Sequence, residues 1–247
     1  REGKRAGGRG FITGRWKSRV RDLPEVMGEL PVSTLIDEII TPGAGKIRGL
    51  VTVAGNPVLS TPDAQTLDRA LEDLDFMVSI DIYCNETTRH ADVILPPPSP
   101  LERSHYDISF TNLSVRNFAH YSPPTFTAHG PSEADIVATL SLILGHQGIH
   151  ADPKEMDRML LETALEGHLT NKESPLFGQD PEDLLPEFDS HAGPDALLDL
   201  MIRTGPYGDL FGQNPDGLSI EKLIANPHGV DLGRLSARIP QILSTPS

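Results

Sequence analysis

A strand–helix–strand pattern between residues 49 and 81 constrains the fold of this chain more than any other feature. Residues 49–54 (GLVTVA) form a short β-branched run of the kind that is buried in parallel sheets. Apolar residues then recur at helical spacing over 64–74, and residues 75–81 (DFMVSID) predict a second strand. A third strand is predicted at 92–96, where a run of prolines ends it. This order predicts an α/β fold with a doubly wound, mostly parallel, Rossmann-like sheet.

The helix between the first two strands is expected to open at Pro62. Thr61 can cap the free backbone amides, and proline suits the first helical position. Asp63 then places a negative charge at the positive end of the helix dipole.

An earlier helix is expected at residues 32–40 (VSTLIDEII). Ser33 or Thr34 is its predicted N-cap, because short hydroxyl side chains accept hydrogen bonds from the first free amides. Asp37 and Glu38 are expected on its solvent-exposed face.

Beyond the third strand, residues 99–130 are expected to form a long irregular loop that aromatic side chains pack. The helix at 132–144 is predicted with Ser132 as its cap and Gly145 at its end. The remaining predicted helices span 153–168, 195–203 and 219–225.

Composition divides the chain into three regions. Residues 1–22 hold eight basic and two acidic residues and are rich in glycine, so they predict a connecting arm, solvated or paired with the rest of the chain. Residues 23–147 make up the predicted Rossmann-like domain. Residues 148–247 predict a helical, loop-rich segment.

Charge and cysteine content exclude several classes of protein. The 247 residues carry 21 basic and 35 acidic side chains, and the net charge of −14 disfavours wholesale binding of nucleic acid. The single cysteine, Cys84, excludes a disulfide framework and any zinc or iron–sulfur site built from clustered cysteines of this chain. No stretch reaches the roughly 18–20 apolar residues of a membrane span. We therefore expect no nucleic acid, no membrane span and no metal ligand here, and a cytoplasmic location.

Two loops at the carboxyl ends of the predicted strands are the candidate site, because open α/β sheets bind ligands there. Residues 55–57 (Gly55, Asn56, Pro57), with the amides of the helix at Pro62, could meet a phosphate. Asp81 ends the next strand, and its carboxylate could accept hydrogen bonds from a ribose diol or from the N1–H and amine of guanine. The same loop continues with Asn85, Glu86 and Thr87. A nucleotide site and a set of helix caps both remain possible from these residues alone.

Spacing identifies no catalytic residue. Glu102, His105 and Asp107 could form an acid–base group, but acidic residues in an irregular loop more often shape turns. His146 and His150 are four residues apart, but glycines interrupt the helix that would align them, so both are expected on the surface.

Four short motifs stand together in an order that resembles one family. They are residues 54–63 (AGNPVLSTPD), 74–81 (LDFMVSID), 85–87 (NET) and 91–96 (ADVILP). In this order and spacing they resemble the third domain of the molybdopterin oxidoreductases, which include formate dehydrogenases, nitrate reductases and dimethyl sulfoxide reductase. The resemblance is dense over 23–98 and thinner to residue 144. Residues 227–232 (PHGVDL) are similar to the approach to that family's C-terminal barrel.

The resemblance implies that this chain is an internal fragment of a large enzyme. In that family molybdenum or tungsten is held by two molybdopterin guanine dinucleotides, and this domain grips the guanosine end of one. Gly55 and Asn56 would then approach the dinucleotide, followed by Pro57, and Asp81 would take guanine or ribose. The loop formed by Asn85, Glu86 and Thr87 would complete the cofactor site, while Asp92 would be structural.

The resemblance also implies partners that lie outside the chain. These are a 4Fe–4S cluster in an N-terminal part, a C-terminal barrel and possible electron-transfer subunits. The fragment lacks the metal ligand and would be inactive alone.

After Glu102 the chain departs from the family pattern of Gly-Thr, Asn and Gly-Arg, because it has Ser104, Asn112 and Arg116 without the glycines. This departure leaves the substrate open. Two alternatives are a scaffold similar to the large subunit of respiratory NADH dehydrogenase, which has no pterin, and a nucleotide-binding middle domain of the thiamine-diphosphate enzyme type.

Overall fold

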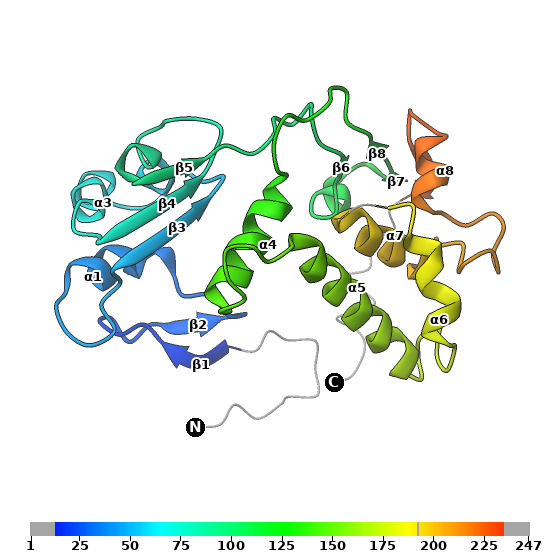
Figure 1. Ribbon diagram of the computed structural model, residues 1–247, viewed down its shortest axis with the longest axis horizontal. Helices are drawn as coiled ribbons and strands as arrows, with labels where there is room; N and C mark the ends of the chain where they lie inside the picture. Colours follow the sequence, from blue (N-terminus) through cyan, green and yellow to red (C-terminus); the bar gives the residue numbers. More distant parts are fainter. Residues whose placement is uncertain (1–12, 192, 235–247) are drawn as a thin grey trace. The chain divides into compact units, whose positions relative to one another are not determined.

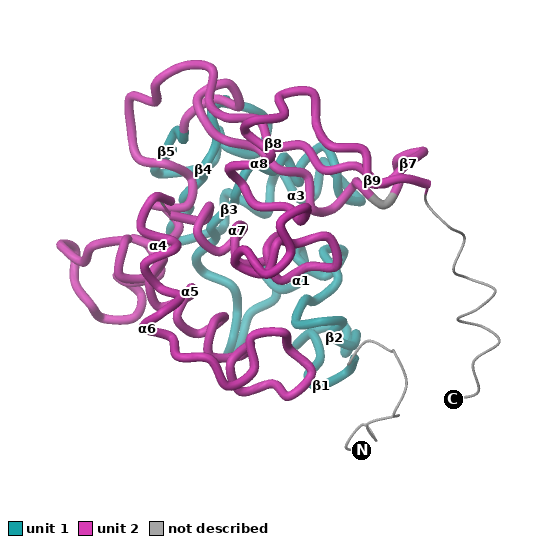
Figure 2. Tube along the Cα trace, turned by 90° about the vertical axis from the view of Figure 1, so that its right-hand side faces the viewer, with its two compact units in different colours: residues 1–97, 238–247 teal, residues 98–237 magenta. Residues whose placement is uncertain are grey.

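The computed structural model describes residues 13–191 and 193–234. The described residues form two compact units, one up to residue 97 and one from residue 98 onward (Figure 2). The predicted boundary at 147–148 lies inside the second unit, between helices α4 and α5. The first twelve residues of the predicted arm lie outside the described part.

A three-stranded parallel sheet forms the centre of the first unit (Figure 1). Its strands are β3 (Gly49–Val53), β4 (Phe76–Ile80) and β5 (Val93–Leu95), in the order β3-β4-β5. The α/β class, the parallel pairing and the three predicted strands are confirmed. The strand order runs in one direction across the described residues, so the reversal that defines a doubly wound sheet is not confirmed.

Helices cover one face of this sheet. Leu50 and Met77 are paired in register and pack against a core that includes Ile39 of α1 (Leu35–Ile40) and Leu67 of α3 (Ala64–Leu71). The opposite face carries apolar side chains such as Phe76, which is 52% exposed. Strand β3 therefore alternates between more and less exposed side chains, whereas four of the five residues of β4, Met77–Ile80, are buried, as the apolar composition predicts.

The crossover between β3 and β4 differs from the predicted helix start. A one-turn helix, α2 (Pro57–Ser60), comes first, and Thr61 ends it by donating its hydroxyl hydrogen to the Pro57 carbonyl. The chain then turns at Asp63, whose φ is +59°, and its side chain accepts a hydrogen bond from Thr66 N to cap α3. The prediction of Thr61 as cap and Pro62 as first helical residue is wrong, because α3 begins at Ala64 and Asp63 is its cap.

Order extends into the basic arm. Strand β1 (Thr13–Lys17) pairs with β2 (Pro24–Val26), and Arg19 forms an ion pair with Glu38. The other arm pairs are Arg15–Glu25, Lys17–Asp22 and Arg21–Asp37. Internal pairing is thus confirmed for the described part of the arm. The prediction that Glu38 faces solvent is wrong, because its carboxylate is buried and accepts hydrogen bonds from Arg19 and Val20 N.

The turn before α1 is η1 (Val32–Thr34). Thr34 holds the N-cap position of α1, but its hydroxyl donates to the Pro31 carbonyl and makes no cap bond. The short 3-10 turn η2 (Thr88–His90) precedes β5.

The second unit is built mainly from helices. Ser132 caps α4 in a reciprocal hydrogen-bonded box with Asp135, as predicted for Ser132. The helices are α4 (Glu133–Leu144), α5 (Pro153–Thr170), α6 (Pro181–Leu184), α7 (Pro194–Thr204) and α8 (Ile220–Ile224), with 3-10 turns η3 (Thr111–Leu113) and η4 (Leu185–Phe188). One hydrophobic cluster centres on Leu165 and Leu200, and another on Ile220 and Leu223.

Short antiparallel pairs organise the segment that was predicted to be an irregular loop. Strand β6 (His105–Tyr106) pairs with β8 (Tyr121–Ser122), and β7 (Arg116–Ala119) pairs with β9 (Val230–Arg234). Tyr121 is buried, but Phe110 and Phe126 are 68% and 59% exposed. Strand pairing therefore holds this segment together with the packing of Tyr121 and Tyr106 into the cluster around Ile220 and Leu223. No helix among the described residues is long and apolar enough to cross a membrane.

Candidate functional site

The two predicted loops lie side by side at one edge of the first unit's sheet. β3 and β4 end together, and Ala54 N donates a hydrogen bond of 2.9 Å to the Ile80 carbonyl just before the loops begin. Residues 55–57 leave β3, and residues 81–87 leave β4. The structure thus brings together all seven residues that were predicted for the cofactor site.

Thr87 ties the two loops to each other. Its hydroxyl donates to Asn56 Oδ1 at 2.7 Å and accepts from Val58 N at 3.0 Å. The Asn56 side-chain amide in turn donates to Glu86 Oε2 at 2.8 Å. Because the Thr87 side chain is fully buried, it positions the loops and does not present a group to solvent.

Asn85 organises the loop that follows β4. Its Oδ1 accepts hydrogen bonds from the backbone N–H groups of Thr87 and Thr88, both at 3.0 Å. Its Nδ2 donates to Asp81 Oδ2 at 3.2 Å. The side chain of Asn85 therefore holds the loop closed and orients the Asp81 carboxylate.

Asp81 is the residue with capacity for a ligand. Its carboxylate accepts from Tyr83 N at 2.9 Å through Oδ1 and from Asn85 Nδ2 through Oδ2, and the residue stays partly exposed. An ionised carboxylate has about four lone-pair sites, so two internal donors leave room for further hydrogen bonds. Asp81 is thus held in one orientation with acceptor capacity to spare.

The electrostatics of this edge favour a ligand that donates hydrogen bonds. Glu86 is exposed on the same loop as Asp81, and the hydrogen bond from Asn56 holds the pKa of the Glu86 carboxyl below its usual value. Two carboxylates therefore face this edge, and they repel a phosphate. The helix whose amides were predicted to meet a phosphate starts at Ala64 and not at Pro62, and its Thr66 N is already bonded to Asp63.

Other residues singled out in the sequence have local roles. Asp92 accepts from Met77 N at 2.7 Å, and its own N–H donates to the Met77 carbonyl, so it fixes the pairing of β4 with β5. Cys84, His146 and His150 are exposed.

The possible acid–base group in the second unit is not assembled. Glu102 Oε2 accepts from Ser99 N at 2.9 Å, and Asp107 Oδ1 accepts from Phe110 N at 2.7 Å. Both carboxylates shape turns, as the loop composition indicated.

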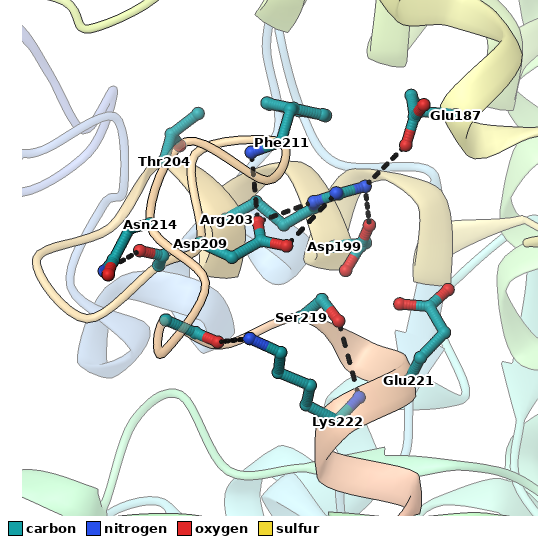
Figure 3. Close-up of polar contacts among 12 residues, drawn as sticks. Glu187, Asp199, Arg203, Thr204, Asp209, Phe211, Asn214, Ser219, Glu221 and Lys222 are labelled. Carbon is teal, nitrogen blue, oxygen red and sulfur yellow. Dashed lines mark hydrogen bonds and ion pairs between the residues drawn. The ribbon is translucent and has the colours of Figure 1, made fainter.

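Sequence reasoning missed a buried polar network in the second unit (Figure 3). Arg203 forms a forked pair with Asp209, with Nε–Oδ1 at 2.9 Å and Nη2–Oδ2 at 3.2 Å, and also donates to Glu187. Asp199, one turn earlier on α7, accepts from Ile220 N at 2.8 Å. The i, i+4 spacing of Asp199 and Arg203 on a predicted helix was the available signal.

Comparison with known proteins identifies the family of this chain. The sequence profile of the family described as molybdopterin oxidoreductase matches residues 5–129. The chain is 47% identical over 58 residues to the assimilatory nitrate reductase catalytic subunit of Bacillus subtilis, covering 24% of this chain and 8% of that protein. It is 38% identical over 81 residues to the F420-dependent formate dehydrogenase subunit alpha of Methanocaldococcus jannaschii, covering 33% and 12%.

A longer and weaker match extends into the second unit. The dimethyl sulfoxide/trimethylamine N-oxide reductase of Rhodobacter capsulatus is 24% identical over an alignment of 206 residues, which covers 76% of this chain and 25% of that protein. The chain thus spans between 8% and 25% of the lengths of these three relatives. The profile match covers just over half of the 247 residues and includes every residue of the two loops, so the chain belongs to the molybdopterin oxidoreductase family.

Proposed function

We propose that this chain binds the guanosine end of a molybdopterin guanine dinucleotide and belongs to a larger molybdenum- or tungsten-dependent oxidoreductase. The proposed contacts come from the loops that contain Gly55, Asn56 and Pro57 and that contain Asp81, Asn85, Glu86 and Thr87. When bound, the metal of such a cofactor would exchange two electrons with the substrate of the parent enzyme. The residues of this chain would bind and orient the cofactor.

The Asp81 carboxylate carries this proposal. Guanine presents the N1–H and the 2-amino group side by side, and a carboxylate can accept from both at once. Adenine lacks this pair of donors, so a carboxylate discriminates in favour of guanine. The hydrogen bonds from Tyr83 N and Asn85 Nδ2 fix the carboxylate before the ligand arrives, which reduces the entropy lost on binding.

The nucleoside, and not the pyrophosphate, fits this edge. Asp81 and Glu86 are both acceptors, while the nearby guanidinium of Arg89 is held by Asp68 at 2.6 Å. Val58 N, which α2 could otherwise offer to an anion, already donates to Thr87. We therefore place the guanine or ribose against Asp81 and the phosphates away from the carboxylates.

Gly55 gives independent support. A Cβ at this position would meet the Val53 carbonyl at 3.6 Å and Pro57 Cδ at 3.9 Å, which are ordinary van der Waals contacts. The fold therefore has room for a larger residue there. The close approach of a ligand to the backbone would give glycine a role at this position.

The rest of the parent enzyme follows from the same proposal. A 4Fe–4S cluster, the metal ligand and a C-terminal barrel would lie outside these residues, with electron-transfer subunits as partners, and this chain alone would be inactive. The scaffold and thiamine-diphosphate alternatives gain no support, since the relatives described above are named as reductases and a formate dehydrogenase.

The test replaces Asp81 with alanine in the parent enzyme and measures guanine nucleotide and metal per protein. Hydrogen bonds to a charged group contribute about 1.5–3 kcal/mol, so cofactor affinity should fall by about 10- to 100-fold. Asp75→Asn is the matched control, because Asp75 is an exposed carboxylate just before the same strand and pairs with Arg48. Normal guanine and metal content in the Asp81→Ala enzyme would refute the proposed contact.

A binding experiment tests the base preference on this chain directly. GMP should shift the backbone NMR signals of residues 81–87 at lower concentration than AMP, and Asp81→Asn should remove the difference. Equal affinity for the two nucleotides would show that the carboxylate does not read the base.

A further inference from the structure

A second cluster of polar groups lies in the second unit, where α7 and α8 contact each other. His191 Nε2 is 2.9 Å from Glu221 Oε1 and 3.6 Å from Asp199 Oδ2. These three atoms all lie within 4.8 Å of one another. His191 precedes α7, while Asp199 and Glu221 belong to α7 and α8.

Two atoms of this cluster are buried without a hydrogen bond. Asp199 is fully buried, and although its Oδ1 accepts from Ile220 N, its Oδ2 has no hydrogen-bond partner among the described residues. His191 Nε2 also lacks one, because its approach to Glu221 has the distance but not the direction of a hydrogen bond. A buried polar atom without a partner is uncommon and destabilising, so a ligand that binds these atoms would explain both of them.

Local charge points to a cation as that ligand. Arg203 directs its hydrogen bonds to Asp209 and Glu187, and its Nη1 is 3.7 Å from Asp199 Oδ2. In Figure 3 the carboxylates of Asp199 and Glu221 lie next to each other, beside the contact between Arg203 and Asp199. Of the four carboxylates in these contacts, Asp199 and Asp209 are buried with the single guanidinium of Arg203, while Glu187 and Glu221 are about half exposed. Two buried carboxylates beside one guanidinium are unfavourable unless a further positive charge compensates them.

We propose that His191, Asp199 and Glu221 bind a divalent transition-metal cation, with Zn²⁺ as the best match. One imidazole nitrogen and two carboxylate oxygens are ligands that zinc accepts, with bonds of about 2.0–2.2 Å. The two carboxylates would neutralise the charge of the ion. A fourth position would be open to water.

One imidazole and two carboxylates favour a transition-metal ion over calcium or magnesium. Calcium takes six to eight oxygen ligands and magnesium prefers carboxylates, phosphates and water, whereas imidazole suits zinc and its neighbours. The bound ion would join α8 to α7 and to the turn before α7. This role is independent of the nucleotide site, because all three ligands belong to the second unit.

The experiment measures Zn²⁺ binding to the full chain in a Cys84→Ser background, since the exposed Cys84 thiol could bind zinc by itself. The chain is stripped with a chelator and titrated with Zn²⁺ against a chromophoric chelator. We expect one ion per chain and a rise in melting temperature. Loss of an outer partner of a metal ligand costs 10- to 100-fold in affinity, so Glu221→Gln should weaken binding by at least about tenfold.

Matched variants separate metal binding from damage to the fold. Glu221 is 57% exposed, so Glu221→Gln should fold normally, and His191→Gln should weaken binding as well. Glu187→Gln is the control, because Glu187 contacts the same Arg203 but not the cluster. Equal zinc affinity in Glu221→Gln and the parent chain would overturn the proposal. So would an NMR spectrum in which the signals of the His191 ring do not change when zinc is added.

Discussion

Gly55 lies between β3 and α2 with space around its α-carbon for a methyl group. The proposed function therefore predicts that Gly55→Ala leaves the stability of the chain almost unchanged and lowers the guanine nucleotide content of the parent enzyme. Thermal unfolding and nucleotide analysis of the same variant provide the two measurements. Gly217→Ala is a contrasting control, because a Cβ there would lie 2.1 Å from the Gly208 carbonyl oxygen and must disturb the backbone. A Gly55→Ala enzyme with full cofactor content would remove the steric argument.

Unlike Gly55, Thr87 stabilises the fold itself, because its hydroxyl forms hydrogen bonds with Asn56 and Val58. Thr87→Val keeps the shape of the side chain but leaves Asn56 Oδ1 and Val58 N without their partner. The expected loss is about 1–3 kcal/mol in the free energy of unfolding for the unsatisfied buried groups. Thr87→Ser keeps both hydrogen bonds, so denaturant titration should find it the more stable variant. The reverse order would mean that methyl packing matters more than the hydroxyl.

These residues show what the sequence could predict about the site. The positions of Asp81 and Asn56 followed from the rule that ligands bind at the carboxyl ends of parallel strands. The distinct tasks of Asn85 and Thr87 could not be predicted, because each depends on which backbone amide or side chain lies within hydrogen-bond distance. Asp199 Oδ2 is a similar case, since its lack of a partner is a property of the packed structure.

At the scale of elements, the β1–β2 pair depends on the buried Glu25. Its carboxylate accepts from Arg15 N at 3.0 Å, from the Arg15 guanidinium and from Gly28 N. These donors, the Arg15 side chain foremost, lower the pKa of Glu25 from 4.5 to about 2. Because the folded state binds the proton more weakly than the unfolded state, this contribution to stability is complete above pH about 4.5 and is lost as the pH falls toward 2.

Glu25→Gln should therefore be less stable than the parent chain at neutral pH, and the difference should shrink between pH 4.5 and 2. Denaturant unfolding across this range measures it. Asp22→Asn is the control, because the Lys17–Asp22 pair is exposed and such pairs contribute little. A gap between the Glu25→Gln and parent chains that does not change with pH would contradict the assignment to the Glu25 charge.

The ends of these helices and strands show which elements local sequence patterns can predict. The helix at 132–144 was predictable because Ser132 and Gly145 mark its ends locally. The start of α3 was not, since Asp63 adopts a left-handed φ of +59° and α2 uses Pro57 as its own first residue. Short strands such as β6 could not be predicted, because the composition around them is typical of an irregular loop. β6 is a strand only through its pairing with β8.

For the whole molecule, the division into two units could not be read from composition. The shift in composition after Gly148 separates α4 from α5, but these helices contact each other within the second unit. The division instead follows Pro97 and so lies inside the run of three prolines, residues 96–98, that comes after β5. A change in residue usage marks where loops become frequent, whereas a unit is defined by which apolar side chains share a core.

Each unit has hydrophobic clusters of its own, so the two should unfold as separate cooperative transitions. The cluster around Ile39 and Leu67 belongs to the first unit, while the clusters around Leu200 and Leu223 belong to the second. Calorimetry of the full chain should resolve two transitions, and the variants should assign them. Thr87→Val should lower only the transition of the first unit. Ser132→Ala should lower only that of the second, by about 1 kcal/mol for the lost cap. A single transition that both variants lower would mean that the units are energetically one domain.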